Sequence, residues 1–71
     1  MSKSVIQNLR KRLVKVGREI HAHGFVPGTV GNISARIPNT DTILIKPSGV
    51  SMGALKPKDL AIVDLQGKQI Q

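Results

Sequence analysis

The chain has 71 residues, enough for one small domain, and it contains no cysteine, which excludes a disulfide framework and a thiolate metal site. Eleven Lys or Arg residues against four Asp or Glu residues give a net charge of +7. Such a balance invites a nucleic-acid partner, but Phe25 is the single aromatic residue, so bases have no set of rings on which to stack.

We therefore expect no nucleic-acid partner, and a small basic nucleic-acid binder is only a remote alternative. No apolar run reaches the length of a signal-peptide core or a membrane span, so we expect a cytoplasmic protein without membrane contact. A single core in a chain this short supplies roughly 3–5 kcal/mol. A chain of this size without disulfides is therefore a small fold with an unusually well packed core, a subunit of a larger assembly, or a fragment.

Residues 4–21 are predicted to form one amphipathic helix, with Ser4 as its N-cap and Gly24 just past its end. The expected buried stripe follows the i, i+4, i+7 pattern and comprises Val5, Leu9, Leu13, Val16 and Ile20. Basic residues lie mostly off this stripe, at Lys3, Arg10, Lys11, Arg12, Lys15 and Arg18. Their run is either a phosphate or nucleic-acid footprint, or a face covered by solvent or a partner, and we favour the second interpretation.

The pair His21 and His23 has a spacing that invites a metal hypothesis. Two residues apart on a helix, the side chains point about 200° apart around the axis, so they cannot share a metal there. We interpret them as histidines at a helix C-terminus, where a positive charge suits the helix dipole. No metal site is therefore predicted in this chain.

A turn at Pro27-Gly28 is predicted to lead into a β-hairpin over residues 30–46. Residues 30–37 alternate, with Ile33, Ala35 and Ile37 on one face and the intervening residues on the other. The sequence "PNTD" is the expected turn and "TILIK" the second strand.

After a loop over 47–53, residues 55–60 are predicted to form one helical turn with Pro57 near its first position. Residues 61–65 are the third strand, Gln66-Gly67 a tight turn, and 68–71 the start of a fourth strand. One helix against three or four strands leaves a sheet face and strand edges uncovered, which natural domains usually avoid. We therefore expect a fragment or a chain with an obligate partner.

Two short polar loops are the candidate site. Glycines let backbone N–H groups approach an anion because no Cβ blocks them, and Gly31 stands beside Asn32, whose side chain also donates. In "KPSG" the proline fits the second position of a β-turn that exposes Ser48 and Gly49. The predicted hairpin brings both loops to one end of the sheet, with Lys46 close by. That convergence predicts a phosphate site, although either loop alone is also an ordinary turn.

The segments "GTVGNISARI" and "ILIKPSGVSMGALKPKDLAIVDLQGK" closely resemble the N-terminal part of the class II aldolase/adducin family. The resemblance covers nearly the whole chain and implies a three-layer α/β/α fold with a largely antiparallel sheet. Residues 1–71 would be the N-terminal fragment of one such domain, with one amphipathic helix and three to four mainly antiparallel strands, incomplete as it stands.

The resemblance also implies chemistry. Family enzymes are aldehyde-lyases and related epimerases and dehydratases in carbohydrate metabolism, and they use a divalent metal, commonly zinc, on phosphorylated sugars. The implied substrate and phosphate contacts are Gly31, Asn32, Ser48 and Gly49, with Thr29 and Lys46 as further candidates. The family's homotetramers place their active sites between subunits.

The family's metal ligands and its acidic catalytic residue follow the second loop by many residues, so none has a counterpart here. His21 and His23 precede that loop and do not match the family's His-x-His. The resemblance implies part of a phosphate site without catalytic or metal residues, inactive alone. Whether the chain serves an enzyme therefore stays open, and a non-enzymatic, adducin-like or remnant interaction protein is the alternative.

Overall fold

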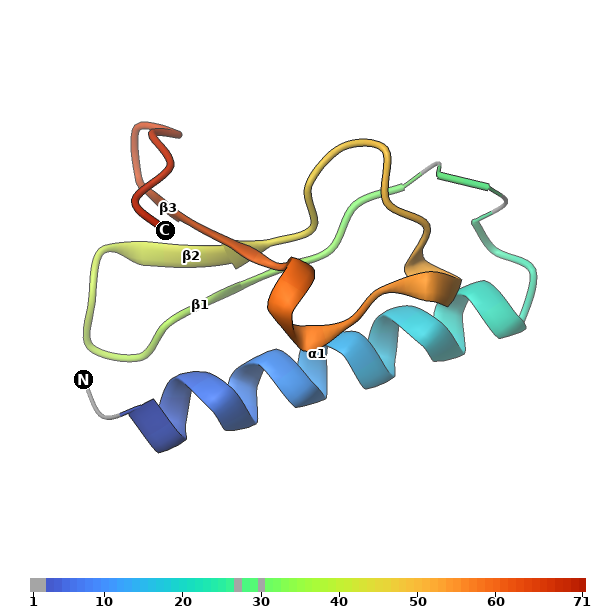
Figure 1. The fold of residues 1–71 in the computed structure, drawn as a ribbon, viewed down its shortest axis with the longest axis horizontal. Helices are drawn as coiled ribbons and strands as arrows, with labels where there is room; N and C mark the ends of the chain where they lie inside the picture. Colours follow the sequence, from blue (N-terminus) through green and yellow to red (C-terminus); the bar gives the residue numbers. More distant parts are fainter. Residues whose placement is uncertain (1–2, 27, 30) are drawn as a thin grey trace.

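In a computed structural model that describes residues 3–26, 28–29 and 31–71, one helix packs along a three-stranded antiparallel sheet (Figure 1). The elements are α1 Lys3–Ala22, β1 Ser34–Arg36, β2 Thr42–Ile45 and β3 Ala61–Asp64, with 3-10 turns η1 Met52–Ala54 and η2 Pro57–Asp59. Two residues of the predicted connection, Pro27 and Val30, lie outside the described part. Among the described residues, no helix is long and apolar enough to cross a bilayer.

The predicted helix is confirmed, but the prediction of its buried stripe is partly wrong. Leu13, Val14 and Gly17 are buried, whereas Val5 and Val16 are 40% and 46% exposed. The buried residues lie on the side of α1 that contacts the 52–60 segment. A periodicity count along the helix alone does not include these contacts.

The two ends of α1 differ in how well the sequence predicts them. The helix already includes Lys3, so Ser4 lies in its first turn and does not precede it as an N-cap. At the other end Gly24 has φ +77°, its N–H donates to His21, and the Phe25 N–H donates to Ile20. These bonds form a Schellman motif, so the predicted stop at Gly24 is confirmed.

The hairpin is confirmed, with a shorter first strand than predicted. β1 and β2 pair antiparallel with Ala35 opposite Leu44, and β3 pairs with β2 so that Ile62 also faces Leu44. Because successive side chains alternate, this row points toward α1 and forms the core with residues of the helix and turns. The core comprises Leu13, Val14, Ile37, Leu44, Leu55, Leu60 and Ile62.

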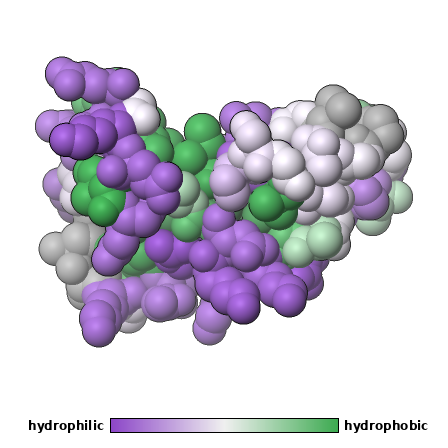
Figure 2. Space-filling model, turned by 45° about the horizontal axis from the view of Figure 1, so that its top comes forward, coloured by the Kyte–Doolittle hydropathy of each residue, from purple (hydrophilic) through white to green (hydrophobic). Residues whose placement is uncertain are grey.

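The opposite face of the sheet carries Ile43, Ile45 and Val63, each partly exposed, as the prediction of an uncovered sheet face requires. Figure 2, which brings the top of Figure 1 forward, shows apolar side chains in a hollow between two projections. The predicted start of a fourth strand is confirmed only in part: residues 68–71 lie antiparallel beside β3 but form one isolated bridge, from Gln69 to Val63, and no full strand. Backbone bonds continue past this bridge, since the Ile62 N–H donates to the Gln71 carbonyl at 2.8 Å and the Ile70 N–H donates to the Ile62 carbonyl at 2.7 Å.

The segment between β2 and β3 contains one turn that was predicted and one that was not. η2 begins at Pro57, as predicted, because proline has no N–H to lose at a first helical position. η1 falls in the predicted loop, and its Met52 is 1% exposed in the core. Ser51 caps η1, since its hydroxyl accepts the Gly53 N–H at 3.1 Å.

Two arginines of α1 tie this segment to the helix. Arg10 Nη1 donates to the carbonyls of Pro57 at 2.8 Å and Leu60 at 2.9 Å. Arg18 donates from Nε and Nη2 to the Leu55 carbonyl at 3.1 and 2.8 Å. These bonds give two arginines of the basic run a structural role. A count of charges in the sequence cannot distinguish such arginines from ones that face solvent.

Replacing Arg10 with methionine should lower the free energy of unfolding by about 1–2 kcal/mol, because two carbonyls lose a charged donor. Urea unfolding followed by circular dichroism measures the change. Arg12→Met is the matched control, since Arg12 is exposed, and it should stay within about 0.5 kcal/mol. Equal effects of the two variants would contradict the tie between α1 and η2.

Candidate functional site

The candidate site lies at the end of the sheet where β1 begins and β2 ends. Ser34 pairs with Ile45, and the Lys46 N–H continues the ladder by donating to the Ile33 carbonyl at 3.0 Å. The next residues on each side are therefore the two predicted loops, 31–32 and 47–50. The structure brings these loops to the same end of the sheet, as the hairpin prediction required.

In the first loop, Gly31 has φ +91°, and a Cβ on it would lie 2.7 Å from Val26 Cγ1. Both the backbone conformation and the contact with Val26 therefore exclude a side chain. Asn32 is exposed, and its Oδ1 accepts the Ile33 N–H at 2.8 Å. With that oxygen engaged, the amide nitrogen of Asn32 is the group left to donate to a ligand.

In the second loop, Ser48 and Gly49 are both exposed, and Gly49 has φ +85°. They are the two central residues of the turn, so the placement of Pro47 at the second position is wrong. The positive φ at the third position is the requirement of a type II turn, which glycine meets without strain. Among the described residues, no acceptor takes the Ser48 hydroxyl or the Gly49 N–H, so both donors remain for a ligand.

Lys46 is buried, at 4% exposure, beneath the two loops. Its Nζ donates to the Val50 carbonyl at 2.7 Å and lies 3.4 Å from the carbonyls of Pro47 and Thr29. The ammonium group therefore joins the 47–50 turn to the loop before β1. Direct contact of Lys46 or the exposed Thr29 with an anion stays a prediction. The sequence signal for burial was the alternation itself, because Lys46 shares a face with Leu44.

The two histidines do not converge. The ring of His21 lies against the backbone of Gly53, where an added Cβ would come within 2.5 Å of Nδ1. His23 Nδ1 lies 2.8 Å from the Glu19 carbonyl, and its ring stacks on Phe25 with the centroids 6.1 Å apart. Within residues 3–26, 28–29 and 31–71, no three His, Cys, Asp or Glu side chains gather where they could hold a metal. These residues do not fit a divalent cation, which needs several such ligands.

The helix on an antiparallel sheet, with two polar loops at one sheet end, defines a small α/β protein. The family description "Class II Aldolase and Adducin N-terminal domain" matches residues 11–71. The chain belongs to this family, and the resemblance stated from the sequence is confirmed.

Three relatives place the chain within the family. Methylthioribulose-1-phosphate dehydratase of Granulibacter bethesdensis is 47% identical over 58 residues, which are 82% of this chain and 27% of that protein. YgbL of Klebsiella pneumoniae, provisionally described as an aldolase/epimerase/decarboxylase, matches with a TM-score of 0.86 and 33% identity over 93% of this chain and 31% of its own. An L-fuculose 1-phosphate aldolase matches with a TM-score of 0.78 and 25% identity over all of this chain and 32% of its own.

The structure therefore has the fold of the N-terminal part of these proteins. The chain spans about a quarter of the length of the curated relative and about a third of the length of the two solved structures.

Proposed function

We propose that this chain supplies part of the phosphate-binding site of a metal-dependent sugar-phosphate aldolase or a related dehydratase or epimerase. The observation that carries the proposal is the meeting of the 31–32 and 47–50 loops at one sheet end, with donors exposed and a buried ammonium beneath them. Amide, hydroxyl and backbone N–H donors suit a phosphate, and charge nearby strengthens such bonds.

The proposed ligand is a ketose phosphorylated at C1. The names of two relatives, methylthioribulose-1-phosphate dehydratase and L-fuculose 1-phosphate aldolase, share that feature although their reactions differ. Two such enzymes can share a phosphate-binding site while the residues that carry out their different reactions lie elsewhere. The location is proposed to be cytoplasmic and the assembly homo-oligomeric, as the family implies.

A divalent metal, when bound in the family's enzymes, polarises a carbonyl and stabilises the charge that develops on it. The residues described here do not fit such an ion, so no catalytic step through it is assigned to them. We propose that other parts of an intact enzyme hold the metal. In this chain the donors of Asn32, Ser48 and Gly49 bind and orient the phosphate, which fixes the position of the sugar. Alone, the chain should bind without turning over.

The test is a titration of the 71-residue chain with L-fuculose 1-phosphate, followed by amide chemical shifts. Shifts should gather at residues 31–32 and 48–50, and unphosphorylated L-fuculose should produce none of them. Ser48→Ala should weaken binding about tenfold, since it removes a hydrogen bond to a charged group.

Gln66→Ala is the control, because Gln66 is an exposed polar residue in the turn after β3, at the opposite end of the sheet, and should leave the affinity unchanged. Equal binding of the phosphorylated and the free sugar would refute the phosphate site. Turnover of the sugar phosphate by the purified chain, with or without zinc, would refute the assignment of catalysis to other residues.

A further inference from the structure

A groove of about 830 Å³ opens between the N-terminal half of α1 and the segment around η2. It shares no lining residue with the loops at the sheet end, so it is separate from the site proposed above. Ile6 and Pro57 contribute apolar surface, and four cationic side chains line it, from Lys3, Arg10, Lys56 and Lys58. The volume falls within the roughly 300–1,000 Å³ of small-molecule sites.

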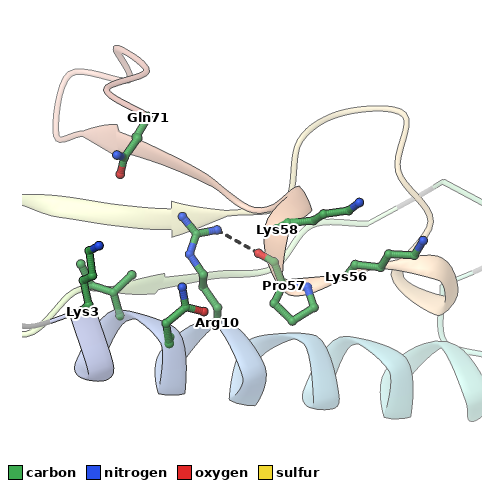
Figure 3. Close-up of a pocket in the computed structure, with 8 residues that line it drawn as sticks. Lys3, Arg10, Lys56, Pro57, Lys58 and Gln71 are labelled. Atoms are coloured by element: carbon green, nitrogen blue, oxygen red, sulfur yellow. Dashed lines mark hydrogen bonds between the residues drawn. The ribbon is translucent and has the colours of Figure 1, made fainter.

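Arg10 stands at the centre of this groove with its guanidinium group already fixed. Figure 3 shows the side chain rising from α1 beside Lys3, with Nη1 turned toward the Pro57 carbonyl. Both hydrogens of Nη1 are used by carbonyls, at Pro57 and Leu60. Nε and Nη2 have no acceptor among the described residues, so they leave three N–H donors for a ligand. Because the group is already ordered, binding through these donors costs little further side-chain entropy.

Within the described part of the chain, no side-chain carboxylate pairs with the cations of the groove. The one ion pair there joins Arg36 to Asp41 at 3.0 Å, at the far side of the hairpin. The Asp59 carboxylate accepts the backbone N–H of Lys56, and the Asp64 carboxylate accepts two backbone N–H groups of its own turn. No Asp or Glu side chain lines the groove, and its lining includes Gln71, which carries the terminal carboxylate of the 71-residue chain. Four cationic side chains outnumber this single carboxylate, so an anion would meet a net positive charge there.

We propose that this groove is a second anion site, which takes a small molecule carrying a multiply charged oxyanion, phosphate or carboxylate, next to an uncharged body. The oxyanion would lie between Arg10 and Lys3, and the uncharged body would rest on Ile6 and Pro57. In Figure 3 Lys56 and Lys58 extend away from Arg10, so they add positive potential at the opposite wall and make no contact with Arg10 or Lys3. A planar guanidinium favours the paired oxygens of phosphate and carboxylate groups.

The experiment titrates the 71-residue chain with inorganic pyrophosphate and, separately, with citrate, at constant ionic strength, because salt screens exposed charges. Backbone amide shifts should saturate at residues 3–10 and at Lys56 and Lys58, which flank Pro57. The double variant Lys3→Gln, Lys58→Gln should weaken binding at these residues about tenfold. Citrate binding without pyrophosphate binding would assign a carboxylate ligand, and the reverse a phosphate ligand.

The matched control is Lys11→Gln, Lys15→Gln, which removes the same charge from exposed positions that do not line this groove. It should change the affinity less than twofold, because only general attraction is lost. An equal loss in both double variants, or non-saturating shifts with both anions, would overturn the site. Shifts confined to 31–32 and 48–50 would also overturn it while leaving the proposed function intact.

Discussion

Replacing Lys46 with methionine should lower the free energy of unfolding by about 2 kcal/mol, a large share of the roughly 3–5 kcal/mol that a core of this size supplies. Two effects oppose each other. Methionine removes the cost of burying a charge with no carboxylate beside it, but it also leaves the carbonyls of Val50, Pro47 and Thr29 without their donor. Because the hydrogen bond to Val50 is short, at 2.7 Å, we expect the loss of the hydrogen bonds to outweigh the gain from removing the buried charge.

With a urea m-value of about 1 kcal/mol/M, the midpoint should fall by about 2 M. Affinity for a sugar phosphate should fall as well, because both loops lose their common tie. Lys56→Met is the control, since Lys56 is exposed in the neighbouring segment and should have little effect on stability. A Lys46→Met chain at least as stable as the original would mean that the cost of burying the charge exceeds the value of its hydrogen bonds.

Local chemistry made most of the fold predictable. The glycine after the helix, the turn before Thr42 and the proline at η2 each act within a few residues, and each is confirmed. The alternation predicted over 30–37 is confirmed as a strand at Ser34–Arg36. The candidate loops follow from the same short-range signals, because a hairpin necessarily brings its strand ends together.

The failures come from contacts between residues distant in sequence. Val5 and Val16 fit a helical stripe, but Arg10 and Arg18 bind the 55–60 segment and turn another face of α1 inward. Met52 enters the core from a stretch that has no periodicity to reveal it. Such long-range contacts leave no local pattern in a single sequence.

Replacing Gly31 with alanine should be the most damaging single change in the candidate loops, with a loss of about 3 kcal/mol. About 1–2 kcal/mol comes from placing a Cβ on a residue with φ +91°. A further 1–3 kcal/mol, roughly, comes from the overlap with Val26 Cγ1 at 2.7 Å. Met52 Cε, at 3.4 Å, can move aside because the side chain is flexible.

Gly67→Ala separates the two terms, because Gly67 has φ +86° but nothing within 4 Å of an added Cβ. It should cost only the backbone term, about 1–2 kcal/mol, in the same urea experiment. The difference between the two alanine variants then measures the overlap at Gly31.

A double-mutant cycle with Val26→Ala tests the assignment directly. Val26→Ala should remove the 2.7 Å overlap with Cγ1 and leave the tight 3.3 Å contact with its Cβ, so the double variant should be more stable than the sum of the single effects predicts by about 1–2 kcal/mol. The backbone term should remain, and with it part of the loss of sugar-phosphate affinity, because the N–H groups of the loop would still be misplaced. Strictly additive effects of the two substitutions would mean that the 31–32 loop relaxes away from Val26. The assumption that this loop is rigid, on which the phosphate site depends, would then be wrong.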